Sequence, residues 1–138
     1  MPSRTVALDT MVVGALLHPS RSHPAAERYR ARIDQRPIVI SFVTVTELRY
    51  GALKANWGEL RRRGLERDLA RLTVVQPDNT LMTVCAELRN RCERSGHPLG
   101  QKIHEADRWI AATALHLELD LLTDDNVFAD VAGLTISR

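Results

Sequence analysis

The sequence predicts an α/β fold in which a central, mostly parallel sheet of four to five strands is covered by helices. Short runs of aliphatic residues alternate along the chain with longer segments whose apolar residues recur every three or four positions. The run at residues 38–40 is apolar throughout, which is typical of parallel strands that are covered on both faces. At 138 residues, the chain is expected to form one domain over residues 1–138.

The expected strands are short, and they lie at residues 4–8, 38–40, 73–75, 119–123 and 134–137. The first strand ends at Asp9, and the fourth leads into an acidic turn at Asp124 and Asp125. The second and third are rich in β-branched residues, which favour the pleated backbone of a strand. Functional sites in parallel sheets form beyond the carboxyl ends of the strands, so these acidic residues are the first candidates for a site.

The segments between the strands show helical periodicity, and they lie at residues 12–17, 25–33, 45–55, 59–72, 81–92 and 103–117. Ser22 is expected to cap the second helix, and Asp78 the fifth, which Gly96 then ends. Residues 97–102 are expected to form a loop. The last helix places Ile103 and Asp107 on its apolar stripe and directs Arg108 to the opposite side.

The composition is that of a soluble globular protein, with 44% hydrophobic and 26% charged residues. The apolar run near the N-terminus is too short for a signal peptide, and no stretch approaches the length of a membrane span, so a cytoplasmic location is expected. Cys85 and Cys92 are too far apart along one helix to form a disulfide and are expected to be buried free thiols. A net charge of +2 neither requires nor excludes a nucleic-acid partner.

Asp107 is the most unusual residue, because an ionised carboxylate among apolar groups costs several kcal/mol unless it is paired or bound to a metal. Asp9 and Asp125 follow strands, and Glu47 lies two turns into the helix after the second strand. Four carboxylates at one edge would repel each other, and one or two Mg²⁺ or Mn²⁺ ions would relieve that repulsion. Such a site suits the metal-dependent hydrolysis of phosphodiesters.

Most of these acids also have a purely structural interpretation. Asp9 could cap the following helix, Glu47 could complete a capping box with Thr44, and Asp124 and Asp125 could be turn residues. Other chemistries have less support, because the chain contains no GxxxxGK, GxGxxG, HExxH or GxSxG motif. A phosphatase of the haloacid-dehalogenase type would need a second Asp at the position of Met11.

Four motifs occur in an order that resembles the PIN-domain ribonucleases, and more specifically the toxins of VapBC-type toxin–antitoxin pairs. The motifs are LDT at 8–10, SxxTxxELRxG at 41–51, EADRWIAATA at 105–114 and LLTDDNVF at 121–128. The resemblance covers essentially the whole chain. It implies an α/β/α sandwich and an acidic pocket that binds Mg²⁺ or Mn²⁺.

Carried over position by position, the acidic residues of the family correspond to Asp9, Glu47, Asp107 and Asp125, which are expected to hold the metal and to be catalytic. The hydroxyl of Thr123 is implied as a supporting contact. The TxD pattern favours Asp125 over Asp124 as the fourth ligand, and Asp124 remains open as a substitute. Met11 and Asp124 depart from the residues that relatives often carry.

The resemblance also implies an RNA substrate, a homodimer, and a cognate VapB-type antitoxin that closes the pocket and carries the pair's contacts with promoter DNA. No membrane contact is expected. Contacts with RNA or antitoxin are expected from basic residues, namely Arg49, Lys54, Arg61, Arg62 and Arg108. The alternative is a catalytically inactive PIN-like module that binds RNA or protein without turnover.

Overall fold

The computed structural model describes residues 4–17 and 23–137. A five-stranded sheet lies at the centre of this part of the chain. The strands are β1 (Val6–Leu8), β2 (Ile38–Ser41), β3 (Thr73–Val75), β4 (Asp120–Leu122) and β5 (Ile136–Ser137). Their order is β3-β2-β1-β4-β5, and every pairing is parallel. The expected parallel sheet is confirmed, and each strand lies within two residues of its expected bounds.

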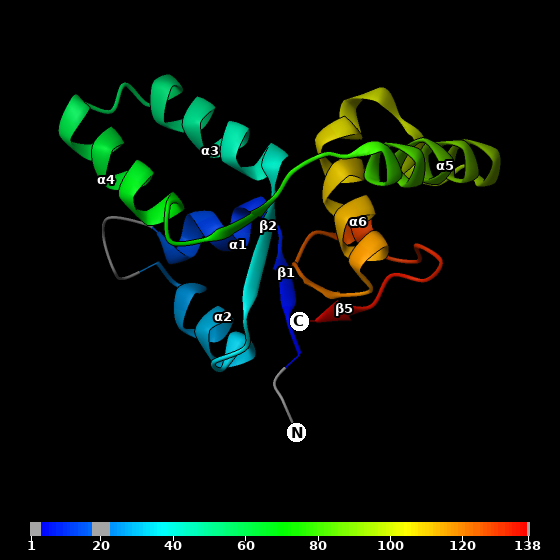
Figure 1. Cartoon of the computed structure of the whole chain (residues 1–138), viewed down its shortest axis with the longest axis horizontal. Helices are drawn as coiled ribbons and strands as arrows, with labels where there is room; N and C mark the ends of the chain where they lie inside the picture. The colour runs from blue at the N-terminus through cyan, green and yellow to red at the C-terminus, as the bar shows by residue number, and fades with distance from the viewer. Residues whose placement is uncertain (1–3, 18–22, 138) are drawn as a thin grey trace.

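The connecting helices are α1 (Thr10–Leu16), α2 (Ala26–Ile33), α3 (Phe42–Lys54), α4 (Glu59–Leu69), α5 (Asn79–Ser95) and α6 (Glu105–Leu117). Short 3-10 turns are η1 (Pro98–Gly100), η2 (Lys102–His104) and η3 (Asn126–Phe128). Figure 1 shows α1 to α4 on one side of the sheet and α5 with α6 on the other. The expected α/β/α sandwich is therefore confirmed.

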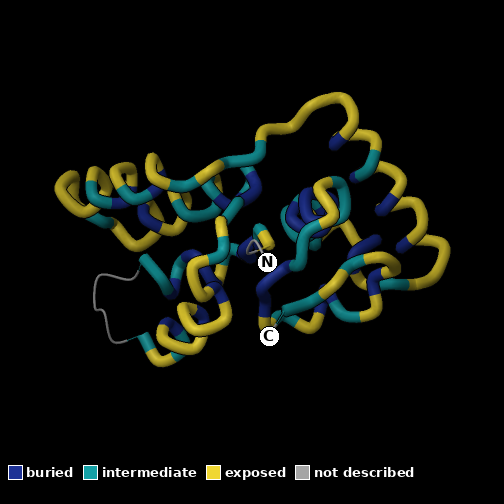
Figure 2. The backbone as a smooth tube through the Cα atoms, turned by 60° about the horizontal axis from the view of Figure 1, so that its bottom comes forward, coloured by how far each residue is buried: buried dark blue, intermediate teal, exposed yellow. Residues whose placement is uncertain are grey.

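The alternation of side chains along β1 builds a separate core on each face of the sheet. Val6 and Leu8 pack with the buried residues of α1 to α4, whereas Ala7 packs with those of α5 and α6. Figure 2 shows the same division, with buried backbone at the sheet and exposed backbone on the outer turns of the helices. Cys85 and Cys92 belong to the second core as free thiols, as expected, and burial raises the pKa of both.

The ends of α5 follow the sequence prediction. The carboxylate of Asp78 accepts a hydrogen bond from the backbone N–H of Leu81 at 2.8 Å, and Gly96 ends the helix with a φ of 74°. Gly100 allows η1 to approach α5, because a Cβ at this position would lie 2.7 Å from the backbone nitrogen of Glu93. The expected cap at Ser22 lies outside the described residues.

The entry to α6 departs from the prediction. The helix begins at Glu105, and the preceding residues 98–100 and 102–104 form consecutive 3-10 turns instead of a loop and a first helical turn. A 3-10 turn has 3.0 residues rather than 3.6, so the apolar stripe does not continue backwards through it. Ile103 was therefore wrongly placed on the buried stripe, and its exposed fraction is 83%.

The prediction that Arg108 points away from the core is also wrong, because this side chain is 2% exposed. Its Nη1 atom donates to the carbonyl oxygens of Leu99 at 2.9 Å and Gln101 at 2.6 Å. The guanidinium thus gives the Leu99 carbonyl a side-chain donor and the Gln101 carbonyl a donor in addition to the N–H of His104. None of the described helices is long and apolar enough to cross a bilayer.

Candidate active site

The carboxyl ends of β1 and β4 bring Asp9 and Thr123 together. The Thr123 hydroxyl donates to Oδ2 of Asp9 at 2.7 Å, and the Thr10 backbone N–H donates to Oδ1 at 2.7 Å. Asp9 therefore caps α1, as its structural interpretation predicted, and also bonds across to β4. Only 4% of Asp9 is exposed, and Thr123 is fully buried.

Asp125 is held beside this pair by backbone hydrogen bonds. Its own N–H donates to the Thr123 hydroxyl oxygen at 3.0 Å, and its Oδ1 accepts from the N–H of Val127 at 2.9 Å. The second bond caps η3, so the interpretation of Asp125 as a turn residue is confirmed as well. The hydroxyl of Thr123 links both acids, because it donates to one and accepts from the backbone of the other.

The charges of the other acids act on Asp9. Burial raises the pKa of Asp9 to about 6, bonds from Thr123 and Thr10 oppose that rise, and the charges of Asp107 and Asp125 add to it. Both of these acids therefore act electrostatically on the carboxyl at the end of β1. A divalent cation would relieve the same repulsion, which is the electrostatic condition for a metal site.

Glu47 lies on α3, and α1 holds its carboxylate. The Thr10 hydroxyl donates to Oε1 of Glu47 at 2.6 Å and lies 2.9 Å from the hydroxyl of Thr44. Because Thr10 has a single hydroxyl proton, Thr44 is the donor in the second bond. The capping-box interpretation of Glu47 is wrong, since Ser41 caps α3 through the N–H of Val43 and Thr44 lies inside the first turn.

Asp107 lies in the first turn of α6 rather than in its middle, and its side chain is 25% exposed. The positive end of the helix macrodipole and access to water therefore lower the cost of its charge below the sequence expectation. Oδ2 of Asp107 lies 2.9 Å from Nδ1 of His104, which precedes the helix.

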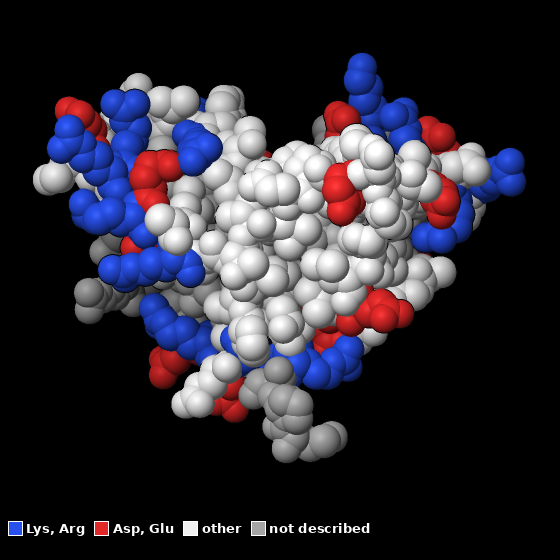
Figure 3. All heavy atoms as spheres, viewed as in Figure 1, with Lys and Arg blue, Asp and Glu red and all other residues white. Residues whose placement is uncertain are grey.

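Figure 3 shows a notch in the surface between the two helical layers, at the end of the sheet where α3 begins.

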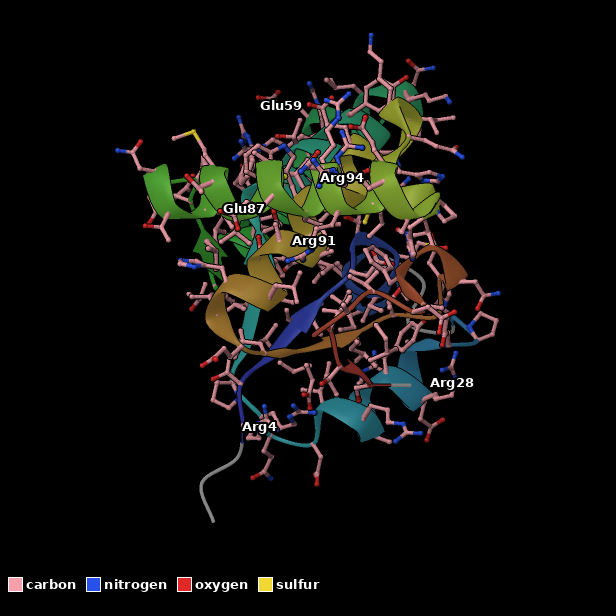
Figure 4. The ribbon with its side chains drawn as sticks, turned by 90° about the vertical axis from the view of Figure 1, so that its right-hand side faces the viewer. Arg4, Arg28, Glu59, Glu87, Arg91 and Arg94 are labelled. Atoms are coloured by element: carbon pink, nitrogen blue, oxygen red, sulfur yellow. The ribbon has the colours of Figure 1, made fainter. Side chains whose placement is uncertain are left out.

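Asp124 is bound by α2. Its carboxylate accepts two hydrogen bonds from Arg28, at 3.2 and 2.6 Å, and one from the Tyr29 hydroxyl at 2.7 Å. Figure 4 shows Arg28 on the outer side of α2. Both oxygens of Asp124 are occupied in this way, which supports the preference for Asp125 as the fourth acid.

The basic residues expected at a partner surface differ in their availability. Arg49 forms a bidentate pair with Glu66, and Arg61 lies 4.0 Å above the Trp57 ring. Lys54 and Arg62 are exposed on α3 and α4, whereas Arg108 was wrongly included, because it is buried on backbone carbonyl groups.

The donor chemistry of the acidic residues fits a hard divalent cation, because Asp9, Glu47, Asp107 and Asp125 offer carboxylate oxygens. The side chains are not drawn together into a ligand shell: among residues 4–17 and 23–137, no three His, Cys, Asp or Glu side chains form a group that could hold an ion. Glu47 accepts a hydrogen bond from Thr10 of α1 instead, and Asp107 is bonded to His104, which precedes α6.

Sequence reasoning missed several side chains that hold the acids. His104 precedes Asp107 by three residues, so this partner could have been found from a spacing that brings side chains together. Thr10 gave no such signal, because 37 positions separate it from Glu47. Arg28 and Tyr29 had no such signal, because about 95 positions separate them from Asp124.

Comparison with known families gives a match to the PIN domain over residues 6–134. Among curated proteins, the chain is similar to the tRNA(fMet)-specific endonuclease VapC of Shigella flexneri, with 31% identity over 115 residues, which is 83% of this chain and 84% of that protein. It is also similar to ribonuclease VapC1 of Haemophilus influenzae strain R2866, with 30% identity over 116 residues, which is 84% of this chain and 83% of that protein.

Solved structures give the same picture. VapBC-1 from nontypeable Haemophilus influenzae matches with a TM-score of 0.75 and 28% identity, covering 96% of each chain. VapBC2 from Rickettsia felis, bound to a DNA fragment from their promoter, matches with a TM-score of 0.77 over 96% of this chain and 97% of that one. At 23% identity, the second match concerns the fold alone.

Proposed function

This chain belongs to the PIN-domain family, and from that premise we propose that it is a Mg²⁺- or Mn²⁺-dependent endoribonuclease, the toxin of a VapBC-type toxin–antitoxin pair. Residues 1–138 are taken as one domain. Two curated relatives with about 30% identity are named for nuclease activity, and each aligns with this chain over more than four fifths of its length. The substrate is RNA, and the reaction is the hydrolysis of a phosphodiester bond.

The observation that carries this proposal is the electrostatic state of Asp9. Its pKa is raised to about 6 by burial, with a further contribution from the charges of Asp107 and Asp125. A carboxyl that is buried at a strand end and faces two other acids destabilises the protein when it ionises, unless a cation is bound. Asp124 differs in this respect, because its charge is paired with Arg28.

Asp9, Asp107, Asp125 and Glu47 would hold one or two divalent ions through oxygen. Such an ion supplies Lewis acidity for the attack of water on phosphorus and positive charge that stabilises the transition state. The surrounding hydroxyl groups orient the acids: Thr123 fixes both the Asp9 carboxyl and the backbone of Asp125. The Thr10 hydroxyl orients Glu47.

The proposed partners are a VapB-type antitoxin and a second copy of this chain, with promoter DNA bound only through the antitoxin. Support comes from structural neighbours that are toxin–antitoxin complexes, one of which is described as DNA-bound VapBC from Salmonella typhimurium. A cavity of about 360 Å³ adjoins Glu47 between α1, α3 and α4, and Leu48 and Trp57 are among its apolar lining residues. This position would suit an antitoxin segment that covers the acids.

RNA cleavage with Mn²⁺ tests the proposal when wild type is compared with Asp107→Asn and Asp9→Ala. We expect both variants to lose more than about 100-fold in rate, because the loss of a direct ligand exceeds the roughly 10- to 100-fold cost of losing an outer-shell partner. His116→Ala, at the far end of α6, is the matched control and should cleave as wild type does. Equal cleavage by all the proteins in the presence of EDTA would overturn the proposal.

Thermal melting in EDTA separates a functional Asp107 from a structural one. The Asp107→Asn variant should melt at the same temperature as wild type or higher, because it removes repulsion among the acids. A lower melting temperature together with normal cleavage would show that Asp107 supports the fold instead.

A second function is favoured by one observation, namely that no group of described side chains is already assembled around an ion position. In this alternative, the chain is a PIN-like module that binds RNA or protein without turnover. Calorimetric titration with Mn²⁺ distinguishes the two functions. Heat of binding that disappears in Asp107→Asn favours the nuclease, whereas no heat at millimolar Mn²⁺ favours the module.

A further inference from the structure

We propose that His104 is a positioning residue for Asp107 and raises the affinity of the acidic site for its divalent cation. This inference rests on the proposed function, because it concerns the same site. His104 is the residue before α6, and its Nδ1 atom lies 2.9 Å from Oδ2 of Asp107. An ionised carboxylate can only accept a hydrogen bond, so Nδ1 carries the proton and donates it.

The backbone that carries His104 is fixed from inside the protein. Nη1 of the buried Arg108 donates to the carbonyl oxygen of Gln101 at 2.6 Å, and the N–H of His104 donates to the same oxygen at 3.0 Å. A second bond from Nη1 to the carbonyl oxygen of Leu99 ties down the preceding 3-10 turn. The imidazole therefore projects from a rigid turn, and its bond restricts the rotation of the Asp107 side chain.

The bond leaves one carboxylate oxygen for a cation. Oδ2 of Asp107 accepts from His104, while Oδ1 accepts no hydrogen bond from the part of the chain that the structure describes. An oxygen without a donor can ligate an ion without first losing a hydrogen bond. Hydrogen bonds of this kind, to the outer oxygen of a metal ligand, orient it and typically account for 10- to 100-fold in affinity.

The bond between His104 and Asp107 is accessible to water. Asp107 is half of a His–Asp pair whose side chains are 30% and 25% exposed, so water competes with the ring for the carboxylate. Without the ring, Asp107 would be free to turn toward solvent, and ordering it would oppose ion binding. The effect of His104 therefore appears in the affinity for the ion rather than in the stability of the metal-free fold.

Calorimetric titration with Mn²⁺ tests this inference on the full chain, with wild type, His104→Ala, His104→Asn and His116→Ala. In asparagine, Nδ2 occupies the position of the histidine Nδ1 atom and can donate the same hydrogen bond. We expect His104→Ala to weaken Mn²⁺ binding by about 10- to 100-fold, and His104→Asn to restore most of that loss. His116→Ala controls for the removal of an imidazole from the same helix and should bind as wild type does.

The outcomes separate this inference from the function on which it rests. A wild-type Kd in His104→Ala, or equally weak binding by His104→Asn and His104→Ala, would overturn the positioning role alone when Asp107→Asn still abolishes binding. No Mn²⁺ binding by wild type would overturn the metal site and this inference together. Melting in EDTA should give similar temperatures for wild type, His104→Ala and His104→Asn, which excludes loss of folding as the cause of weaker binding.

Discussion

The two sides of the acidic site are held in different ways. On the sheet side, Asp9 and Asp125 are fixed by backbone N–H groups and share the buried hydroxyl of Thr123. On the helix side, Glu47 and Asp107 are each held by a single side chain, from Thr10 and His104, and both are partly exposed. The sheet side is thus built into the fold, whereas the helix side depends on side chains that can exchange partners.

This difference suggests a division of roles within the proposed nuclease. Two acids that the backbone fixes give the site a constant position, and their mutual repulsion makes it receptive to a cation. Two acids with exchangeable partners can adjust to the ion and to RNA without changing the fold. Variants on the sheet side should therefore alter folding stability, and variants on the helix side should alter mainly function.

The largest expected effect on stability is a pH dependence that arises from Asp9. Its pKa is about 6 in the folded protein and near 3.8 when unfolded, so between these values the folded state binds a proton that the unfolded state has lost. The contribution of Asp9 to the free energy of unfolding in EDTA should therefore be highest near pH 4 and fall by roughly 3 kcal/mol as the pH rises through 6, at about 1.4 kcal/mol per pKa unit. Urea unfolding at a series of pH values measures this fall.

Asp9→Asn is the control for that measurement, because it cannot ionise. Its stability should change less than that of wild type over this pH range, and saturating Mn²⁺ should reduce the fall in wild type. Parallel curves of unfolding free energy against pH for the two proteins in EDTA would mean that the ionisation of Asp9 does not destabilise the fold. The sheet side would then not differ from the helix side in this respect.

Removing one hydroxyl group from the sheet side or from the helix side should lower the free energy of unfolding by an intermediate amount. Thr123→Val leaves Oδ2 of Asp9 and the N–H of Asp125 without a partner in a buried place, at a cost of about 2 kcal/mol. Thr10→Val should cost about half as much, because water can reach the partly exposed Glu47. The free energy of unfolding at pH 7 in EDTA measures both, and equal costs would remove the proposed distinction.

Thr113→Val is a matched control for both threonine variants. Thr113 is buried on α6, and its hydroxyl donates to the carbonyl oxygen of Trp109 one turn earlier, so it has no link to the acids. This variant measures the cost of replacing a buried threonine by valine as such. The excess cost in Thr123→Val then belongs to the sheet side of the site.

The same division explains what could be predicted from the sequence. Asp9 and Asp125 follow strands whose apolar runs are unmistakable, and parallel pairing brings strand ends to one edge, so their meeting could be foreseen. Asp107 was assigned to the site because it was expected in the middle of a helix, and that reason is wrong. Its helix begins later than the periodicity suggests, and the residue is in a first turn rather than on a buried stripe.

The interactions that could not be predicted depend on which side chains form hydrogen bonds with the irregular segments of the folded chain. Arg108 is buried where it donates to two carbonyl oxygens of the segment that forms the 3-10 turns, and no sequence pattern marks those turns. His104 meets Asp107 through the same turns. Side-chain partners in irregular segments follow from backbone geometry, which hydrophobic periodicity does not specify.

The smallest expected effect concerns the pair of Arg28 and Asp124, which lies beside the sheet side and is largely exposed. Arg28→Ala should leave the melting temperature close to that of Arg63→Ala, which breaks another exposed ion pair, with Glu59. Its Kd for Mn²⁺ should rise by less than the roughly 10-fold that marks an outer-shell partner of a ligand, because backbone bonds still hold Asp125. A larger rise in Kd that is reversed in the charge-swapped Arg28→Asp and Asp124→Arg double variant would mean that α2 also holds the sheet side. The sheet side would then depend on side chains, as the helix side does.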